Sequence, residues 1–218
     1  MVLRVAALLL ILLAAPARAE APPDPFEEAN RGIQAFNDLL RQHVLGPVAS
    51  FYVETTPQPV RAGIARALSN LGEPVTAVNA LLAGEVEIAR NAAMRFGINT
   101  VLGYGGVQDA AAERGHAPRP FTLGDAACRW GVPAGPYLVL PVLGPSSLRD
   151  AVAQMVTGVA LSQAVGSEAV TAWASGLGFT DYAEIHRDLT QAEAFSLDPY
   201  ALHRAAWSQR RAATCPSD

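Results

Sequence analysis

Four histidines are the residues of this chain best suited to acid–base or hydrolytic chemistry. They are His43, His116, His186 and His203. Each lies in a different local sequence, and no serine occupies the GxSxG turn that holds the nucleophile of many hydrolases. Two carboxylate pairs, Glu27-Glu28 and Glu85-x-Glu87, fall in the first turns of expected helices, where the helix dipole stabilises negative charge. The spacing therefore predicts no catalytic site and no enzyme activity.

The two cysteines and the complete lack of lysine limit the kinds of metal and cofactor site that the chain can form. Neither Cys128 nor Cys215 has a second Cys or His at ligand spacing, so we expect no metal site. An exported chain can join them in one disulfide, but two isolated cysteines form no framework pattern, and the pairing stays open. Every cationic side chain apart from histidine is arginine, which removes the lysines of Schiff-base and phosphate-loop sites. We expect no cofactor.

The first nineteen residues have the features of a secretory signal. Arg4 supplies the charged start, Val5 to Ala15 the apolar stretch, and Ala17-Arg18-Ala19 the small-x-small cleavage site. The apolar stretch is too short to span a bilayer, for which about 20 residues are needed. We predict a signal peptide at 1–19 and one helical domain at 20–218.

Composition favours a single folded domain and excludes nucleic acid as a partner. Of 218 residues, 50% are hydrophobic and 17% are charged, which is unlike a disordered chain. The formal net charge is −4, and removal of the signal with Arg4 and Arg18 makes it more negative. Binding to nucleic acid needs a basic stripe that neutralises phosphates, and this chain has none.

The stretch from Trp130 to Asp150, WGVPAGPYLVLPVLGPSSLRD, is as apolar as a core strand but contains four prolines. Because proline cannot continue a helix or donate to a sheet ladder, a central strand and a spanning helix both fit this stretch poorly. We expect an irregular apolar segment. Such backbone tolerates lipid only where it is buried in protein or lines a cavity, which indicates a protein that works at a membrane without crossing it.

Hydrophobic residues recur at threes and fours along the mature chain, and this period predicts helices. The expected helices cover residues 25–44, 58–71, 75–83, 85–101, 109–115, 147–165, 180–194 and 199–213. Gly72-Glu73-Pro74 is expected to interrupt the helical pattern. Ser146 or Ser147 is expected to cap the helix at 147–165. No strand alternation lasts beyond four residues. The sequence predicts an all-α fold, a single domain of amphipathic helices with an irregular proline-rich apolar segment.

Short motifs in a fixed order are spread along the mature chain. They are Asp24-Pro25-Phe26-Glu27, Asn30-Arg31, Phe36-Asn37, Pro57-Gln58-Pro59-Val60-Arg61, Asn70-Leu71, Glu73-Pro74, Asn79, Arg95-Phe96, Asn99-Thr100, Gly103 to Asp109, Trp130 to Asp150, Ser196 to Tyr200, Arg204 and Gln209-Arg210-Arg211. The first three resemble a DPxExxNRxxxxFN opening, and the proline-rich segment is similar to WGVGxGPYLVLPxLGPSxxRD nearly residue for residue. Together they resemble the MlaA, or VacJ, family of outer-membrane lipoproteins.

The resemblance implies a fold and a task. Members of that family form a ring of helices in the inner leaflet of the outer membrane, with an amphipathic channel through the ring. They withdraw mislocalised phospholipids from the outer leaflet, usually while bound to a trimeric porin, and pass them to a periplasmic lipid carrier. A lipid headgroup that crosses hydrocarbon needs a polar path, and a ring supplies one without exposing backbone to lipid. We therefore expect an exported protein on the periplasmic side of the outer membrane.

The sequence departs from the family pattern in two places. Family members usually carry a lipobox cysteine after the signal, whereas no cysteine precedes position 128. Ordinary signal-peptidase cleavage is then expected, with attachment through apolar helix faces and partner proteins. Residues 123–128 read LGDAAC where the family more often has FGQTLG, so Cys128 replaces a small glycine. Two other functions stay open, a soluble periplasmic lipid-binding or scaffold protein and a lipid hydrolase.

Eight residues from these motifs are candidates for lining a lipid channel. They are Asn30, Arg31, Phe36, Asn37, Asp109, Tyr137, Arg149 and Asp150. The seven-residue spacing of Asn30 and Asn37 places both on one helix face. Structural roles compete with lipid contact: helix capping for the asparagines and Asp109, core packing for Tyr137, and an ion-pair network for the adjacent Arg149 and Asp150.

Overall fold

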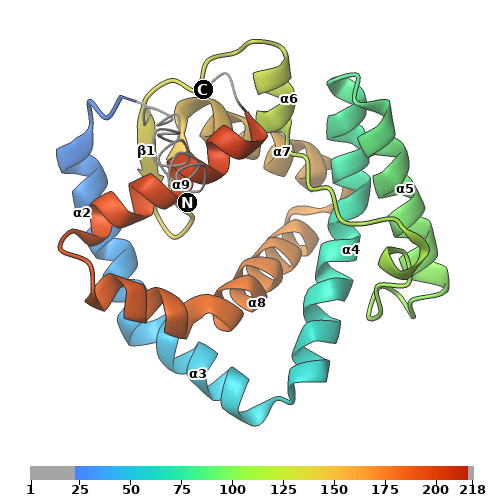
Figure 1. Cartoon of the computed structure of the whole chain (residues 1–218), viewed down its shortest axis with the longest axis horizontal. Coiled ribbons are helices and arrows are strands. Elements are labelled where there is room, and N and C mark those ends of the chain that lie inside the picture. Colours follow the sequence, from blue (N-terminus) through green and yellow to red (C-terminus); the bar gives the residue numbers. More distant parts are fainter. Residues whose placement is uncertain (1–22, 216–218) are drawn as a thin grey trace, which may run out of the picture.

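Helices arranged around a central opening in the ribbon make up most of the protein (Figure 1). The computed structural model describes residues 23–215, so the signal peptide predicted at 1–19 lies outside the described residues. The elements are α2 (Glu27–Leu40), the π-helix η1 (Arg41–Leu45), α3 (Gly46–Thr55), α4 (Gln58–Leu82), α5 (Val86–Val101), the 3-10 turn η2 (Ala112–Arg114), α6 (Leu123–Arg129), β1 (Tyr137–Leu140), β2 (Gly144–Ser147), α7 (Leu148–Val165), α8 (Ser167–Ala194) and α9 (Pro199–Thr214). The predicted all-α fold is confirmed, with one small two-stranded sheet added.

The first helical run does not stop at residue 44 as predicted. It continues from α2 through the π-turn η1 into α3, although Gly46-Pro47 follows directly. The backbone N–H of Gly46 bonds to the carbonyl of Arg41, five residues back. This wider register shifts the carbonyls that precede Pro47, and so a residue with no N–H is accommodated without ending the helix.

Helix α4 is continuous through Pro74, so the predicted break at Gly72-Glu73-Pro74 is wrong. Proline inside a helix costs about 3 kcal/mol because it removes one backbone hydrogen bond and crowds the preceding turn. Packing compensates, since α4 and α5 lie side by side along their lengths (Figure 1). Next to Pro74, Glu73 accepts a 2.5 Å hydrogen bond from Arg95 of α5. Tertiary contacts therefore override the local helix-breaking pattern.

Other boundaries differ in ways that local periodicity does not reveal. The predicted helix at 109–115 is reduced to the single turn η2, whereas α8 begins at Ser167 rather than at 180. Helix α6 was not predicted, and it begins with a capping box in which Thr122 and Asp125 satisfy each other's backbone N–H groups. The predicted cap of α7 is confirmed, because the Ser147 hydroxyl accepts from the backbone N–H of Asp150 at 3.2 Å.

The proline-rich segment is ordered as a hairpin rather than wholly irregular. Strands β1 and β2 pair antiparallel, with Tyr137 opposite Ser147 and Leu140 opposite Gly144. Each strand of a two-stranded sheet has one free edge, where a missing N–H removes no ladder bond, so a proline within β2 is tolerated. The expectation of irregular backbone therefore fails between 137 and 147.

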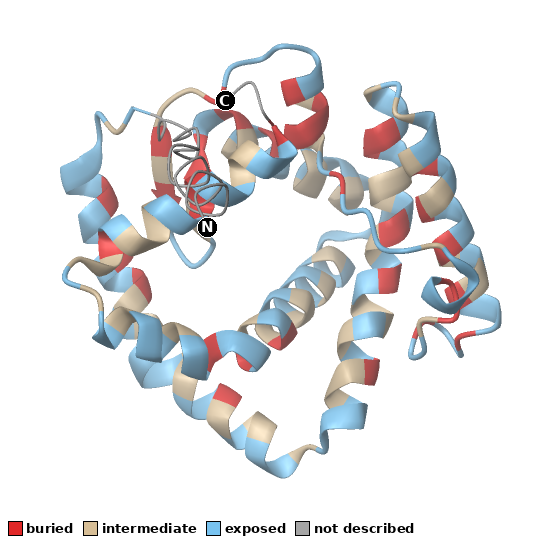
Figure 2. Cartoon of the chain, viewed as in Figure 1, coloured by how far each residue is buried: buried red, intermediate tan, exposed pale blue. Residues whose placement is uncertain are grey.

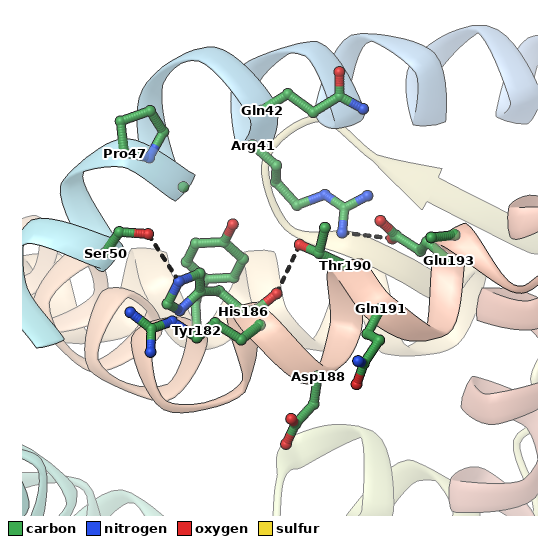
Figure 3. A pocket seen from close by; sticks show the side chains of 13 residues that line it. Arg41, Gln42, Pro47, Ser50, Tyr182, His186, Asp188, Thr190, Gln191 and Glu193 are labelled. Carbon is green, nitrogen blue, oxygen red and sulfur yellow. Dashed lines mark hydrogen bonds and ion pairs between the residues drawn. The ribbon is translucent and has the colours of Figure 1, made fainter.

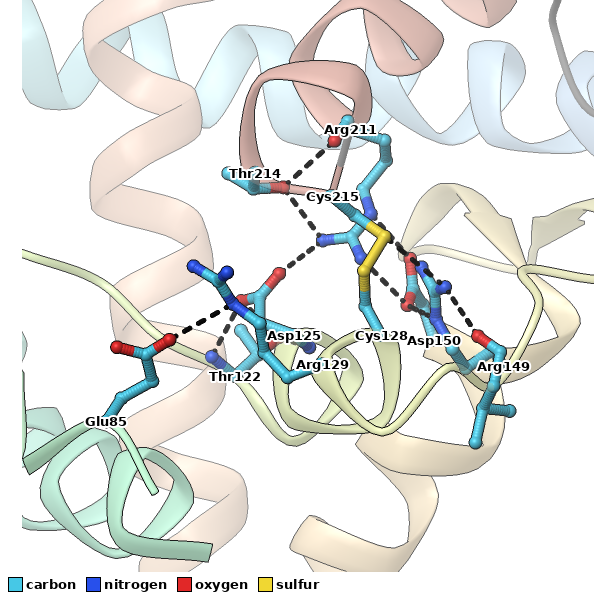
Figure 4. Close-up of a disulfide and its surroundings, with 11 residues drawn as sticks. Glu85, Thr122, Asp125, Cys128, Arg129, Arg149, Asp150, Arg211, Thr214 and Cys215 are labelled. Carbon is cyan, nitrogen blue, oxygen red and sulfur yellow. Dashed lines mark hydrogen bonds and ion pairs between the residues drawn. A yellow bond between two sulfur atoms is a disulfide. The ribbon is translucent and has the colours of Figure 1, made fainter. Parts of the chain in front are cut away.

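A disulfide joins Cys128 of α6 to Cys215, the residue after α9, and this answers the open question of pairing. Beside it, Arg211 of α9 donates to Asp125 at 2.6 Å and contacts Asp150 of α7 at 3.1 Å (Figure 4). Ion pairs and a covalent bond thus hold the end of α9 against α6 and α7.

We expect the Cys128→Ser/Cys215→Ser double variant to unfold more readily than the parent. The disulfide closes a loop with a sequence separation of 87 residues. Its loss should lower the free energy of unfolding by about 2–5 kcal/mol, because the unfolded chain regains entropy. Thermal unfolding with and without reductant measures this. Reductant should lower the melting temperature of the parent and leave that of the double variant unchanged, and equal melting of both proteins would contradict the prediction.

Candidate functional site

Asn30 is a buried joint between α2 and the hairpin. Its amide oxygen accepts from the backbone N–H of Val139 at 2.9 Å, and its amide nitrogen donates to the Tyr137 carbonyl at 3.1 Å and to Asp24 at 2.8 Å. Only 2% of the residue is exposed. The side chain thereby satisfies strand groups at the edge of β1 that would otherwise lack partners.

Asn37 repeats this arrangement one step along the hairpin. It accepts from the Val142 N–H at 2.7 Å and donates to the Leu140 carbonyl at 3.0 Å. Seven residues of helix rise about 10.5 Å, and three residues of strand extend about 10 Å. The spacing of Asn30 and Asn37 therefore matches that of Tyr137 and Leu140, whose carbonyls accept from the two amides, which explains why both amides reach β1.

Arg31 ties α2 to the start of α9. Its guanidinium forms a fork with both carboxylate oxygens of Asp198, at 2.8 and 3.1 Å, contacts Glu27 at 2.8 Å and lies 4.3 Å from the ring centre of Tyr200. Hydrogen bonds from Arg31 lower the pKa of Asp198 to about 2. Asp198 also caps α9, accepting from the Tyr200 N–H at 3.0 Å. Arg31 therefore serves as an interhelical clamp.

Asp109 belongs to a cluster around the buried Arg95. Arg95 donates to Asp109 at 3.1 Å and to Glu73 at 2.5 Å, and Asp109 also accepts from Asn99 at 3.1 Å and from the Ala112 N–H at 3.1 Å. Burial raises the pKa of Glu73, and the hydrogen bond from Arg95 opposes that rise. The N-cap residue of η2 is Ala111, which makes no side-chain cap hydrogen bond, so Asp109 does not occupy the predicted cap position; its carboxylate is shared between α5 and the turn after it.

Tyr137, Arg149 and Asp150 lie in packed joints, and Phe36 does not. Tyr137 is fully buried, with its ring 5.4 Å from that of Trp207, and burial raises its pKa to about 12. The predicted ion pair is present, since Arg149 contacts Asp150 at 3.1 Å beside the disulfide (Figure 4). Phe36 is 52% exposed.

The structure does not bring the eight predicted residues into one site. Four gather where α2 meets the hairpin and α9, Asp109 lies at the end of α5, and the Arg149–Asp150 pair lies beside α6. Their polar atoms are used in joints between elements. Lipid contact by these residues stays a prediction.

Buried residues alternate with exposed ones along the helices (Figure 2), and the buried set is rich in polar and small side chains, whereas many large apolar side chains are exposed. The buried positions of α2 are all polar, and those of α5 are two alanines, an arginine and an asparagine. Exposed apolar side chains include Phe36, Leu39, Phe51, Leu71, Leu81, Val101, Met155, Val159 and Phe195. A soluble protein normally has the opposite distribution, because apolar burial drives folding in water. The exposed apolar side chains of these helices suit an apolar environment.

A pocket of about 610 Å³ opens between the end of α8 and the segment formed by η1 and α3 (Figure 3). Its lining residues are Arg41, Gln42, Gly46, Pro47, Ser50, Tyr182, His186, Arg187, Asp188, Thr190, Gln191, Glu193 and Ala194. Arg41 contacts Glu193 across the pocket at 2.7 Å. The sequence prediction missed this site, although Tyr182, His186 and Thr190 recur at the four-residue spacing of one helix face.

Ser50 and His186 form the only arrangement in this pocket that resembles hydrolytic chemistry among the described residues. The two side chains meet at 3.1 Å between Oγ and Nε2, and Nδ1 lies 2.9 Å from the Ala183 carbonyl, so the neutral ring donates from Nδ1 and accepts from Ser50. Ser50 lies inside a continuous helical run, where neighbouring N–H groups are used in helical bonds rather than free to bind an oxyanion. The geometry therefore supports a structural hydrogen bond better than catalysis.

Comparison with known families assigns the chain. A sequence model described as MlaA lipoprotein matches residues 22–214. The chain belongs to the MlaA lipoprotein family. A solved structure reported as "Structural basis for maintenance of bacterial outer membrane lipid asymmetry" shares the fold, with a TM-score of 0.76 and 32% sequence identity over 88% of this chain and 98% of that one. Within residues 23–215, no helix of this MlaA family member is long and apolar enough to cross a bilayer.

Relatives of known name share the family assignment. The intermembrane phospholipid transport system lipoprotein MlaA of Escherichia coli K12 is 32% identical over 86% of this chain and 76% of its own length, and that of Haemophilus influenzae is 34% identical over 85% and 76%. An uncharacterized protein of Rickettsia felis is 38% identical, but the match covers 64% of this chain and only 55% of that protein. The chain thus spans about half the length of that relative.

The clamp between Arg31 and Asp198 should make the stability of this MlaA family member depend on acidic pH. Because the folded pKa of Asp198 is about 2, below the value near 3.9 of an unfolded aspartate, the ionised clamp stabilises the fold above pH 4. That stabilisation is lost as pH falls from 4 through 2. Asp198→Asn keeps a helix cap but removes the charge.

The melting temperature of Asp198→Asn should lie below that of the parent at pH 6, and the difference should vanish near pH 2. A Glu87→Gln variant, which removes half of an exposed ion pair with Arg90, is the control and should show little difference at either pH. A difference between Asp198→Asn and the parent that stays constant from pH 6 to pH 2 would contradict the clamp.

Proposed function

We propose that this chain transports phospholipids between membranes, as a component on the periplasmic side of the outer membrane. The observation that carries the proposal is the distribution of polarity, because many large apolar side chains are exposed on helices whose buried positions are polar or small. In a bilayer, apolar side chains face the lipid, and polar groups must pair within the protein. The joints around Asn30, Arg95 and Arg149 provide that internal pairing.

Helices of this kind lie in the interface with their apolar faces in the acyl region. Exposed Val152, Met155, Val156 and Val159 give α7 a broad apolar face, while Arg149 and Ala153 are buried against the rest of the protein. A ring of such helices offers a lipid headgroup a path that is shielded from hydrocarbon. The acyl chains of the same lipid can remain in the surrounding apolar phase.

The names of the relatives support the coarser part of the proposal, the transport of phospholipid between membranes. The Escherichia coli relative is named a lipoprotein of an intermembrane phospholipid transport system, and the similar solved structure concerns outer-membrane lipid asymmetry. For this chain we propose withdrawal of mislocalised phospholipids from the outer leaflet, association with a trimeric porin and delivery to a periplasmic lipid carrier. No chemical conversion of the lipid is part of this task.

Deletion of the gene should sensitise the host to detergent with EDTA, and the full chain supplied in trans should restore resistance. Phospholipid left in the outer leaflet weakens the barrier, which is why the assay reports on transport. Ser50→Ala serves as a control that should complement fully. A deletion strain with a normal barrier, or fatty acid release by the purified protein that Ser50→Ala abolishes, would overturn the transport proposal.

Fractionation tests membrane attachment through the outer faces of the helices. Met155→Asp with Val159→Asp places two charges on the exposed face of α7 and should move the protein from the outer-membrane pellet to the soluble periplasm. Gln154→Asp, on the same helix at an exposed polar position, should stay in the pellet. Circular dichroism confirms that both variants fold. A parent protein that never pellets would favour a soluble lipid-binding protein or scaffold.

A further inference from the structure

We propose that the pocket between η1, α3 and α8 binds the headgroup of a zwitterionic phospholipid, a phosphodiester joined to an ammonium group. The inference rests on the proposed function and adds to it a site and a headgroup preference. Its basis is the combination of a balanced set of charges in the pocket, exposed apolar side chains on the same elements, and a π-turn in the pocket wall.

The lining carries both signs of charge in equal number. Arg41 and Arg187 are cationic, while Asp188 and Glu193 are anionic. Arg41 is held between Asp38 and Glu193, but a guanidinium has five N–H donors and these contacts leave some of them available. A zwitterion can satisfy both signs, whereas an anionic headgroup meets no net positive charge.

Side chains with exposed polar ends lie along the same wall. Asp188 and Gln191 are exposed, and they point away from the Arg41–Glu193 pair in Figure 3. Arg187 has 61% of its side chain exposed and contacts Glu54 at 2.8 Å, an exposed pair that a ligand phosphate can displace at small cost. These groups can contact a headgroup without breaking a buried joint.

Apolar side chains on the same elements are placed for acyl chains. Val44 of η1, Val48 and Phe51 of α3 and Ile185 of α8 are all at least half exposed. A polar pocket on elements that also present apolar side chains to the surroundings is suited to an amphiphile rather than to a free polar solute. The cavity volume of about 610 Å³ lies within the range of small-molecule sites.

The π-turn places two polar side chains in the pocket wall. π-turns inside α-helices are rare and occur frequently at functional sites. Here η1 supplies Arg41 and Gln42 to the pocket. A Cβ at Gly46 would lie 2.9 Å from the Arg41 carbonyl oxygen, so the turn requires glycine at a helical position, where it costs about 1 kcal/mol relative to alanine.

Calorimetry with soluble short-chain lipids tests the pocket in the purified full-length chain. Dihexanoyl phosphatidylethanolamine should bind at least about five-fold more tightly than dihexanoyl phosphatidylglycerol, both below their micelle concentrations. Ala194→Trp fills the pocket and should weaken binding of the zwitterionic lipid at least about ten-fold. Ala192→Trp, at an exposed position of the same helix outside the lining, is the matched control and should bind like the parent.

Charge is tested separately with Asp188→Asn, which gives the lining a net positive charge. The preference for the zwitterionic lipid should fall about three-fold, while Glu168→Gln at the exposed start of α8 should leave it unchanged. Equal binding by the two tryptophan variants, or no preference in the parent, overturns the pocket assignment even where the barrier assay succeeds. A parent that binds neither lipid and fails to restore the barrier overturns the proposed function instead.

Discussion

Pairing of buried polar groups is the constraint on which the rest of this structure depends. Asn30, Asn37, Arg95 and Arg149 are all buried, and each bonds to backbone or to a partner from another element. In a water-soluble protein the same positions would hold apolar side chains, and burial of their surface would supply most of the stability. Here the two buried apolar clusters are small, and one consists largely of alanine. Unpaired buried polar groups are costly, and these four side chains are paired, although the buried Tyr137 hydroxyl and the Asn70 amide oxygen have no hydrogen-bond partner among the described residues.

The helices do not pack around one continuous core, because the buried apolar side chains of the described residues form two separate clusters. Separate interactions therefore connect elements that are distant in sequence. Two asparagines connect α2 to the hairpin, Arg31 connects α2 to α9, and the disulfide with Arg211 connects α9 to α6. Between α6 and α7 the fit is so close that a Cβ at Gly124 would lie 2.5 Å from an Asp150 oxygen. Each of these interactions has a defined geometry, and together they hold the helices in one arrangement.

Hydrophobic periodicity predicted the helices whose ends are set by their own local sequence. Helices α5, α7 and α9 match the expected ranges closely, and Ser147 caps α7 as foreseen. The failures occur where distant contacts decide: α4 continues through Pro74 beside α5, and a π-turn carries the first run past Pro47. The family motifs gave these residues as candidates for lining a lipid channel, and a single sequence does not show that their polar atoms are used within the protein. The pocket was missed because its two walls are far apart in sequence, with a separation of 136 between Ser50 and His186.

The use of buried polar side chains in joints limits which residues can recognise a lipid. An amide such as that of Asn30, with donor and acceptor both used on the hairpin, has little capacity left for a passing headgroup. Recruiting it would expose unpaired strand groups and loosen the ring. Recognition is therefore expected from side chains whose removal leaves no buried group unpaired, and Asp188 and Gln191 on α8 meet that condition because both are exposed. Under the proposed headgroup site, the motif residues hold the helices in place, and the residues that contact the headgroup lie on the pocket face of α8, outside those motifs.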